Sequence, residues 1–246
     1  MFGPEERERY ARHILLKEIG GPGQQRLKAA VVAIVGVGGL GAPAALYLAA
    51  AGVGRLRLID DDSVSLSNLQ RQIVFRTADA GATKVERAAA ALTALNPHAE
   101  IEARNVRLTG ANARDLLDGA DLVLDGSDEF ATRFTVNAAC RAVGVALVSG
   151  AVGRWDGQVS VFKRGGPCYR CLVSEAPPDA ETCARVGVVG ALTGVIGSMM
   201  ALEAIKEIAG AGEPLNGRVL IYDALAATAR TVALSRDPAC PVCARE

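Results

Sequence analysis

The sequence predicts an α/β fold with a mostly parallel, doubly wound sheet. Over about the first 150 residues, short β-branched runs alternate with Ala-rich helical stretches. This alternation is typical of strand–helix–strand units, whose helices cover both faces of a parallel sheet. From Gln158 onward, strands of alternating polarity predict antiparallel pairing at one edge. Half of the residues are apolar and only 4% are aromatic, which fits Ala-rich helices packed on a parallel sheet.

The predicted elements begin with a charged helix over 5–16, which the glycine-rich run at 20–23 is expected to end. Further helices are predicted over 24–28, 40–51, 83–95, 112–118, 130–143 and 187–209. Strands are predicted over 30–35, 55–59, 100–106, 122–124, 145–149, 158–162, 218–222 and 229–234. Asn96 precedes Pro97 and is therefore expected to end its helix.

The turn after the first strand has the sequence GVGGLG. Gly36, Gly38 and Gly41 have the spacing that permits a tight turn, a close ligand and close helix packing, and Gly39 lies within the same turn. The helix that follows offers free N–H groups to phosphate. Asp60, at the end of the second strand, is placed to bind a ribose. These features predict a Rossmann-like nucleotide site; the alternative is that the glycines only pack the helix on the sheet.

A second set of polar residues surrounds this turn. Arg71 and Lys84 supply positive charge, and Asn68 and Gln72 can hydrogen-bond phosphate or ribose. Asp128 follows the fourth strand, at the carboxyl edge where ligands of such sheets bind. A carboxylate there, together with phosphate oxygens, suits Mg²⁺. Any of these charges alone could be a solvated surface residue, but their grouping predicts a site that grips a triphosphate such as ATP.

Four of the six cysteines form two CxxC pairs, Cys168 with Cys171 and Cys240 with Cys243. Such a set is typical of a tetrahedral structural Zn²⁺ site, here a clip that ties the C-terminal segment to the body. A redox CxxC or disulfides are the alternatives, although a cytosolic setting argues against stable disulfides.

The remaining cysteines and both histidines give weaker signals. Cys140 is expected to be a small core residue. Cys183 lies in a polar loop beside Arg185, and two interpretations stay open: an activated nucleophile or an inert thiol. His13 and His98 have no sequence partner that would suggest a catalytic triad.

Charge and hydropathy exclude several classes of function. Lys and Arg balance Asp and Glu at 27 each, which disfavours nucleic acid and acidic membranes as partners. The uncharged stretch 29–54 contains Pro43 and several glycines, so it is interpreted as strand, turn and helix rather than a membrane span. The charged start MFGPEERERYAR lacks the apolar core of a signal peptide. A cytoplasmic protein is expected.

Together these motifs resemble the ThiF/MoeB family of bacterial adenylating enzymes, which are related to ubiquitin activators. The resemblance extends from about Glu8 to Cys243. It is carried by RYAR at 9–12, GVGGLG, Asp60 with SLSNLQRQ at 65–72, KVE at 84–86, DGSD at 125–128, SGA at 149–151, DGQ at 156–158, both CxxC pairs and GVIGS at 194–198. It implies one adenylation domain over 1–246, with a nucleotide-binding half over about 1–150 and a carrier-binding, zinc-clip half over about 151–246.

The resemblance also implies a reaction. A small ubiquitin-like sulfur carrier ending in Gly-Gly would present its terminal carboxylate to MgATP, giving an acyl-adenylate and pyrophosphate. A separate sulfur donor could then form a thiocarboxylate. The carboxylate is already ionised at neutral pH, so no general base is needed. Molybdopterin, thiamin, tRNA-thiolation and sulfur-amino-acid routes all use this chemistry, and a molybdopterin-type or shared activator is expected.

Roles for single residues follow from the same resemblance. Gly38 and Gly41 would shape the phosphate turn and Asp60 would hold the ribose, while the phosphates and Mg²⁺ would be held by Asn68, Arg71, Lys84 and Asp128. Arg12 matches a residue that reaches across a homodimer interface to the neighbour's ATP. Cys183 matches a thiol that in some relatives bonds to the carrier. Two positions depart from the family pattern: Glu129 replaces a frequent Asn, and Ala191 replaces a common Pro.

Two other functions compete with this one. An NAD-dependent oxidoreductase would share GxGxxG and Asp60, but it would leave Arg71, Lys84 and Asp128 unexplained. A non-catalytic, nucleotide-bound scaffold for a ubiquitin-like partner would not need to retain Asp128.

Overall fold

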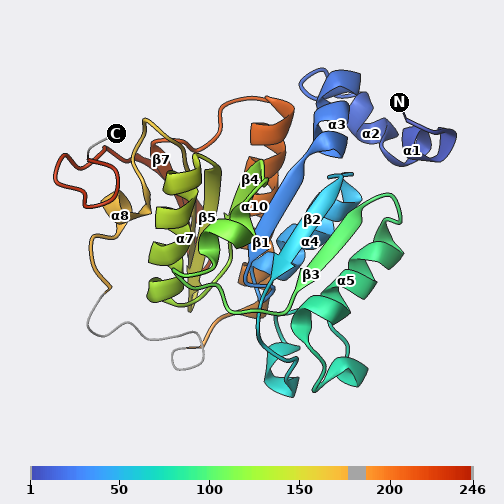
Figure 1. Cartoon of the computed structure of the whole chain (residues 1–246), viewed down its shortest axis with the longest axis horizontal. Helices are drawn as coiled ribbons and strands as arrows, with labels where there is room; N and C mark the ends of the chain where they lie inside the picture. Colours follow the sequence, from blue (N-terminus) through green and yellow to red (C-terminus); the bar gives the residue numbers. More distant parts are fainter. Residues whose placement is uncertain (1, 177–186, 245–246) are drawn as a thin grey trace.

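A computed structural model describes residues 2–176 and 187–244 of the chain and contains one eight-stranded sheet (Figure 1). The strand order is β3-β2-β1-β4-β5-β6-β7-β8. The strands are β1 (Val31–Val35), β2 (Arg55–Ile59), β3 (Glu100–Arg104), β4 (Leu122–Asp125), β5 (Ala146–Gly153), β6 (Asp156–Phe162), β7 (Arg218–Asp223) and β8 (Thr228–Ala233). Strands β1 to β5 pair in parallel, and β5 to β8 pair antiparallel. The predicted fold class is thus confirmed.

Helices cover both faces of the sheet. The helices of the described residues are α1 (Pro4–Arg9), α2 (Ala11–Ile14), α3 (Gly20–Ala29), α4 (Gly41–Ala50), α5 (Lys84–Leu95), α6 (Ala113–Leu117), α7 (Phe130–Val143), α8 (Tyr169–Leu172) and α10 (Gly190–Ala209). Two short 3-10 turns, η1 (Leu66–Asn68) and η2 (Thr77–Asp79), lie between β2 and α5. One core contains residues of α3, α4, α5 and α10, and the other contains residues of α6, α7 and α8.

Alternation along β1 explains the two cores. Val32 and Ile34 point into the α4 and α10 side, whereas Ala33 and Val35 point into the α7 side. Because side chains alternate along a strand, a strand buried on both faces is a continuous apolar run, as β1 is.

The N-terminal helices differ from the prediction. The helix expected over 5–16 is divided at Tyr10, whose side chain is buried and whose hydroxyl accepts a hydrogen bond from Asn96 Nδ2 at 2.8 Å. The glycine-rich run at 20–23 starts α3 instead of ending a helix. Pro22 is tolerated there because the first turn of a helix needs no N–H donor from it.

Two further differences lie in the second half of the chain. Strand β5 continues to Gly153 because it forms a hairpin with β6, in register from Leu147 opposite Phe162 to Gly153 opposite Asp156. Helix α8 begins directly after Cys168 and was not predicted.

Within the described ranges, no helix combines the length and apolarity needed to cross a membrane, and the stretch 29–54 forms β1, a turn and α4.

Candidate nucleotide site and cysteine cluster

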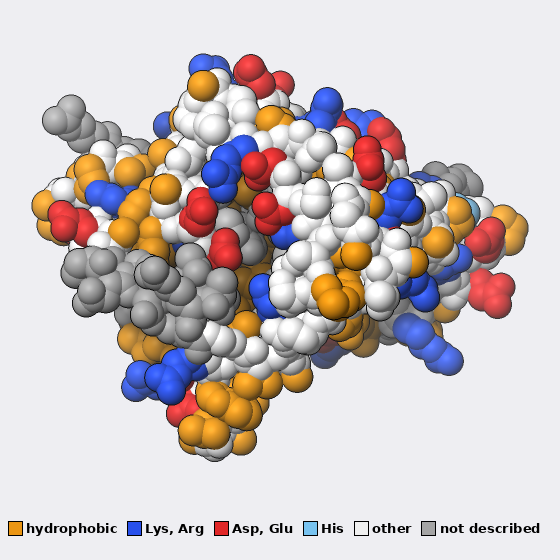
Figure 2. Space-filling view, turned by 90° about the horizontal axis from the view of Figure 1, so that it is seen from below, with side chains coloured by type: hydrophobic (Ala, Val, Ile, Leu, Met, Phe, Trp, Pro, Cys, Tyr) orange, Lys and Arg blue, Asp and Glu red, His pale blue; other side chains and the backbone are white. Residues whose placement is uncertain are grey.

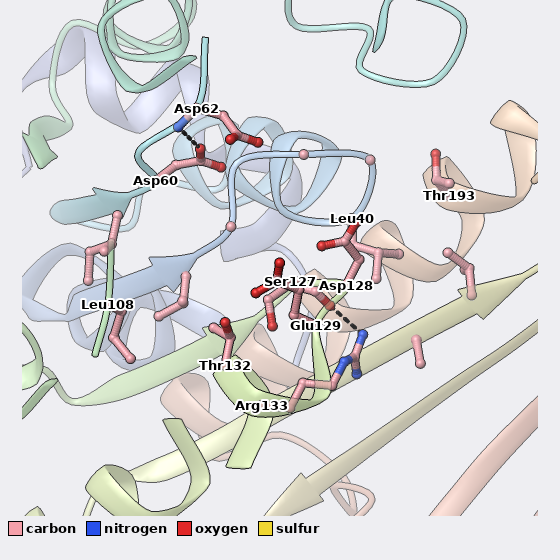
Figure 3. A pocket seen from close by; sticks show the side chains of 18 of the residues that line it. Leu40, Asp60, Asp62, Leu108, Ser127, Asp128, Glu129, Thr132, Arg133 and Thr193 are labelled. Carbon is pink, nitrogen blue, oxygen red and sulfur yellow. Dashed lines mark hydrogen bonds between the residues drawn. The ribbon is translucent and has the colours of Figure 1, made fainter. Parts of the chain in front are cut away.

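A cavity of about 530 Å³ opens at the carboxyl ends of β1, β2 and β4. Its lining includes most of the predicted site residues: Gly36, Gly38, Gly39, Asp60, Asn68, Arg71, Gln72, Lys84 and Asp128. In the view of this end of the sheet, acidic side chains gather near the middle of the face, with basic side chains beside them (Figure 2). The close-up shows the turn after β1 between Asp60 and Ser127 (Figure 3). The structure thus brings residues from distant parts of the sequence to one hollow.

The glycines of the turn differ in what surrounds them. Gly36 has φ +82°, and a Cβ there would lie 3.0 Å from Ser127 N. A Cβ on Gly41 would lie 1.9 Å from Gly36 O, which leaves no room for a side chain. At Gly38 the nearest atom to such a Cβ is Gln72 Nε2 at 3.5 Å. The first two glycines are therefore required by the backbone, whereas Gly38 leaves space at the cavity.

Asp60 fastens the turn to the end of β2. Its Oδ2 accepts a hydrogen bond from Val37 N at 2.7 Å, and its Oδ1 accepts one from Asp62 N at 2.8 Å. Burial raises the pKa of Asp60, and the positive charge of Lys84 opposes that effect. The carboxylate thus shapes the turn, and Asp60 also lines the cavity.

Lys84 is held by a residue that sequence reasoning did not single out. Its side chain is buried, and Nζ donates to Asp62 Oδ2 at 2.7 Å. The Lys84 backbone N–H also donates to Asp62 O, at 3.0 Å. The run of three aspartates at 60–62 was the available signal, but sequence alone did not show which carboxylate faces the lysine.

The other polar residues of this loop are less constrained. Arg71 Nη1 donates to Ser67 O at 3.2 Å. Asn68 Oδ1 accepts from Ser65 N at 3.1 Å, which caps η1. Gln72 is buried, and its Oε1 has no hydrogen-bond partner among the described residues. Buried amides normally have hydrogen-bond partners, so a ligand in the cavity would supply the donor that Gln72 Oε1 lacks.

The loop between β4 and α7 presents Asp128 to the cavity. Buried Asp125 accepts hydrogen bonds through Oδ1 from Ser127 N at 3.0 Å and Ser127 Oγ at 2.6 Å. Arg133 Nη2 donates to Ser127 O, and Nη1 donates to Gly150 O at 2.9 Å. Burial raises the pKa of Asp125, while the charge of Arg133 acts in the opposite direction. Arg133 is a buried support that sequence reasoning missed, and Asp125 was noted only as part of the DGSD motif, without this supporting role.

A pair of opposite charges lies at the side of the cavity nearest β3. Arg107 Nη2 is 3.4 Å from Glu129 Oε1, and Arg107 Nε is 3.6 Å from Asp61 Oδ2. Arg107 was not predicted as a site residue, since nothing near it in sequence marks it. The other departure from the family pattern, Ala191, is an exposed residue in the first turn of α10.

Of the residues predicted for the nucleotide site and described by the structure, Arg12 and Gly41 are not in the cavity lining. Arg12 is exposed on α2, and Tyr10 just before it packs beside Gly52, which precedes the amino end of β2. Arg12 therefore lies at the opposite end of the sheet from the glycine turn (Figure 1). Cys183 lies outside the described residues. His13 contacts Gln24 at 3.2 Å, away from the cavity lining.

The four CxxC cysteines converge. Cys168 Sγ lies 3.6 Å from Cys240 Sγ, Cys171 Sγ lies 3.4 Å from Cys243 Sγ, and all four sulfurs are within 4.8 Å of one another. None of them is disulfide-bonded in the structure. Zn–S bonds of about 2.3 Å in a tetrahedron place sulfurs about 3.8 Å apart, so the cluster fits Zn²⁺. Asp237 N donates to Cys171 Sγ at 3.4 Å, a bond that would stabilise a thiolate there.

Fold and site together define a Rossmann-like nucleotide-binding protein with a four-cysteine cluster beside its antiparallel strands. The ThiF family profile matches residues 10–242, and the chain belongs to this family.

Curated relatives match over nearly the whole chain. The sulfur carrier protein adenylyltransferase of Thermus thermophilus is 48% identical over 98% of this chain and 92% of its own. The molybdopterin-synthase adenylyltransferase of Escherichia coli is 48% identical over 97% of both chains. The SAMP-activating enzyme E1 of Haloferax volcanii is 47% identical over 96% of this chain and 88% of its own.

Solved structures share the fold at lower identity. E. coli MccB with AMPCPP and MccA has a TM-score of 0.84 and 24% identity, over 96% of this chain and 74% of that chain. The crystal structure of PaaA has a TM-score of 0.82 and 25% identity, over 96% of this chain and 76% of that chain.

Proposed function

We propose that this chain is an adenylyltransferase that uses ATP to activate the C-terminal carboxylate of a small ubiquitin-like sulfur-carrier protein. One observation carries the proposal: three curated proteins named for this activity, or for activating SAMP, are 47–48% identical over nearly the full chain. The cavity supports it, because it gathers the glycine turn with Arg71, Lys84 and Asp128. An NAD-dependent oxidoreductase would share the turn and Asp60 but would not need these three side chains.

The nucleotide would lie along the turn after β1. Backbone N–H groups at the start of α4 suit phosphate oxygens, and the space at Gly38 allows close approach. Asp60 would bind the ribose, and Asn68 and Gln72 would add uncharged hydrogen bonds. Arg71 and Lys84 would neutralise phosphate charge, Lys84 as a point charge held in place by Asp62.

Asp128 is the proposed Mg²⁺ ligand. It is exposed at the cavity and makes no hydrogen bond or ion pair with another described residue, so its carboxylate is available. Mg²⁺ favours one or two carboxylates together with phosphate oxygens, and the donor set fits. Bound there, the ion would neutralise phosphate charge. Asp125 and Arg133 would keep the loop that carries Asp128 in place.

The reaction is a substitution at the α-phosphorus of ATP. An oxygen of the carrier carboxylate forms a bond to this phosphorus while the bond to the pyrophosphate oxygen breaks. The protein would contribute positioning and neutralisation of charge, since the nucleophile is already ionised at neutral pH. A general base is not required.

The cavity also extends toward β5 and α8. Ala151, Val152, Tyr169 and Val188 line this part, which is more apolar than the glycine turn. A flexible Gly-Gly tail would suit it, and the antiparallel half over about 151–246 would dock the carrier body. Sulfur would come from a separate donor. The carrier would belong to a molybdopterin, thiamin or thiolation route.

Three further features complete the proposal. Cys168, Cys171, Cys240 and Cys243 would hold a structural Zn²⁺. Arg12, at the far end of the sheet, would act in the cavity of a second copy, so the protein would be a homodimer. Cys183 would be a candidate for a covalent link to the carrier.

The test is ATP–pyrophosphate exchange with purified protein, Mg²⁺ and a panel of small sulfur carriers, each intact and without its Gly-Gly end. Exchange that depends on an intact carrier would establish the reaction, and the preferred carrier would indicate the pathway. If ATP binds but no carrier supports exchange, the proposal is wrong and a nucleotide-bound scaffold takes its place.

A further inference from the structure

Three buried polar side chains occupy one face of α7. Arg133, Asn137 and Arg141 are 6%, 1% and 7% exposed, and each is four residues from the next. Residues at this spacing lie on the same side of a helix. A helix that packs on a sheet usually buries apolar residues on this side, and a buried polar group is costly unless it has a partner. The face must therefore be matched by specific acceptors and donors.

The two arginines bind backbone carbonyl groups. Arg133 donates to Gly150 O on β5, and Arg141 donates to Gly166 O in the loop before Cys168. These bonds hold the two ends of this polar face of α7 against β5 and against the loop before Cys168. Asn137, between them, has a different environment, because it contacts the cysteine cluster.

Both ends of the Asn137 carboxamide are engaged. Its Nδ2 donates to Cys168 Sγ at 3.6 Å, within the range for sulfur acceptors, and its Oδ1 accepts from Tyr169 N at 2.9 Å. Cys168 is fully buried, so water has no access to replace this donor. The two bonds fix the orientation of the amide, since exchanging its O and N would lose both. The chemistry suits a thiolate, which accepts hydrogen bonds but donates none.

We propose that Asn137 is a positioning residue of the metal centre: it donates to the Cys168 thiolate and anchors the first CxxC pair on α7. This inference rests on the zinc site of the proposed function but not on the adenylation reaction. Outer partners of metal ligands orient them and tune their basicity, and their loss typically costs about 10–100-fold in metal affinity. Asn137 would hold Cys168 in place for the ion and stabilise its negative charge.

Asn137→Asp is the most selective test. The aspartate has nearly the same shape and can still accept from Tyr169 N, but it places an oxygen where Nδ2 donated to sulfur. Zinc-loaded protein is mixed with excess chromogenic chelator, and zinc release is followed with time. The variant is expected to release zinc about tenfold faster. Ala138→Ser, at an exposed position next to Asn137 on the same helix, is the matched control and should release zinc at the native rate.

A spectroscopic measurement separates positioning from a general loss of stability. In Co²⁺-substituted protein, losing the donor to Cys168 should shift the sulfur-to-metal charge-transfer band, whereas a merely structural role would lower Tm without moving it. If Asn137→Asp does not fold, Asn137→Ser is used, because its hydroxyl is too short to reach Cys168. Native release kinetics with an unchanged Co²⁺ spectrum would overturn the inference, as would wild-type protein that binds no zinc. Failure of carrier activation would refute only the proposed reaction.

Discussion

The glycine turn at residues 36–41 and the cysteine cluster are held in place by different kinds of contact. Around the turn, backbone atoms touch directly: Gly41 has no space for a Cβ, and Asp60 binds the Val37 N–H. In the cluster, four sulfurs converge from segments far apart in the chain. The turn is thus formed by the protein alone, whereas the cluster would be completed by the proposed Zn²⁺, which would offset part of the charge of four thiolates. The comparison separates a site that local sequence encodes from a site that a bound ion would complete.

Zinc removal should have the largest effect. Free zinc at about a thousand times Kd stabilises a folded protein by about 4 kcal/mol. For a chain of this size, that corresponds to about 10 °C in Tm. Chelation, or Cys243→Ser, should therefore lower Tm by about that amount in differential scanning calorimetry. ATP affinity at 25 °C should stay within about twofold, since the turn does not contact the cysteines. An unchanged Tm would mean that no bound metal stabilises the protein, which would contradict the proposed zinc site.

Two glycine substitutions test the turn. Gly41→Ala would drive a methyl group into Gly36 O, so it should cost about 3 kcal/mol in urea unfolding, the upper part of the overpacking range, and abolish nucleotide binding. Gly38→Ala meets only Gln72 Nε2, so its stability should change by about 0.5 kcal/mol or less. Its ATP affinity should nevertheless fall about tenfold, because the methyl group occupies ligand space. Equal stabilities for the two variants would contradict the assigned roles.

The ion pair between Glu6 and Lys28, which belongs to neither region, should depend on pH. The atoms are 2.6 Å apart, and the hydrogen bond from Lys28 lowers the pKa of Glu6 below its ordinary 4.5. A depressed acid pKa adds stability above the unfolded value, and that stability is lost as pH falls through the folded value. Glu6→Gln should thus cost about 1 kcal/mol at pH 7 in urea unfolding, with no difference in acid. If Glu6→Gln loses the same stability at every pH, the ion pair with Lys28 is not the cause of the loss.

Replacing Glu129 should have the smallest effect. Glu129→Asn removes the exposed pair with Arg107, which should change stability by about 0.5 kcal/mol or less. It also removes a negative charge from the cavity lining, so ATP should bind a few-fold more tightly at low salt, with the gain falling as salt screens the charges. Glu86→Gln, exposed on α5 and outside the cavity lining, is the control and should leave ATP affinity unchanged. Weaker ATP binding by Glu129→Asn would indicate that this carboxylate contacts the nucleotide.

The same comparison explains which features could be predicted. The glycine turn and the parallel strands follow from local spacing and apolar runs, and both were found as expected. Contacts between distant segments could not be predicted from the sequence, because they depend on where neighbouring strands end. These are the ion pair of Asp62 with Lys84, the hydrogen bond from Arg133 to the loop that carries Asp128, and the ion pair of Arg107 with Glu129. The N-terminal helix was predicted as one piece because its charge pattern did not show that Tyr10 enters the core.

The most direct test of the central claim is ATP–pyrophosphate exchange by Arg71→Ala beside wild type, with Mg²⁺ and an accepted intact carrier. The Arg71 side chain lies in the cavity and its Nη1 donates to Ser67 O, while the bond from Thr193 Oγ1 reaches the Arg71 backbone, which alanine keeps. Its loss should therefore leave folding intact. Exchange should fall by at least a hundredfold, or about 2.7 kcal/mol, while exposed Arg76→Ala behaves as wild type. Wild-type exchange by Arg71→Ala would contradict the assignment of this cavity as the adenylation site.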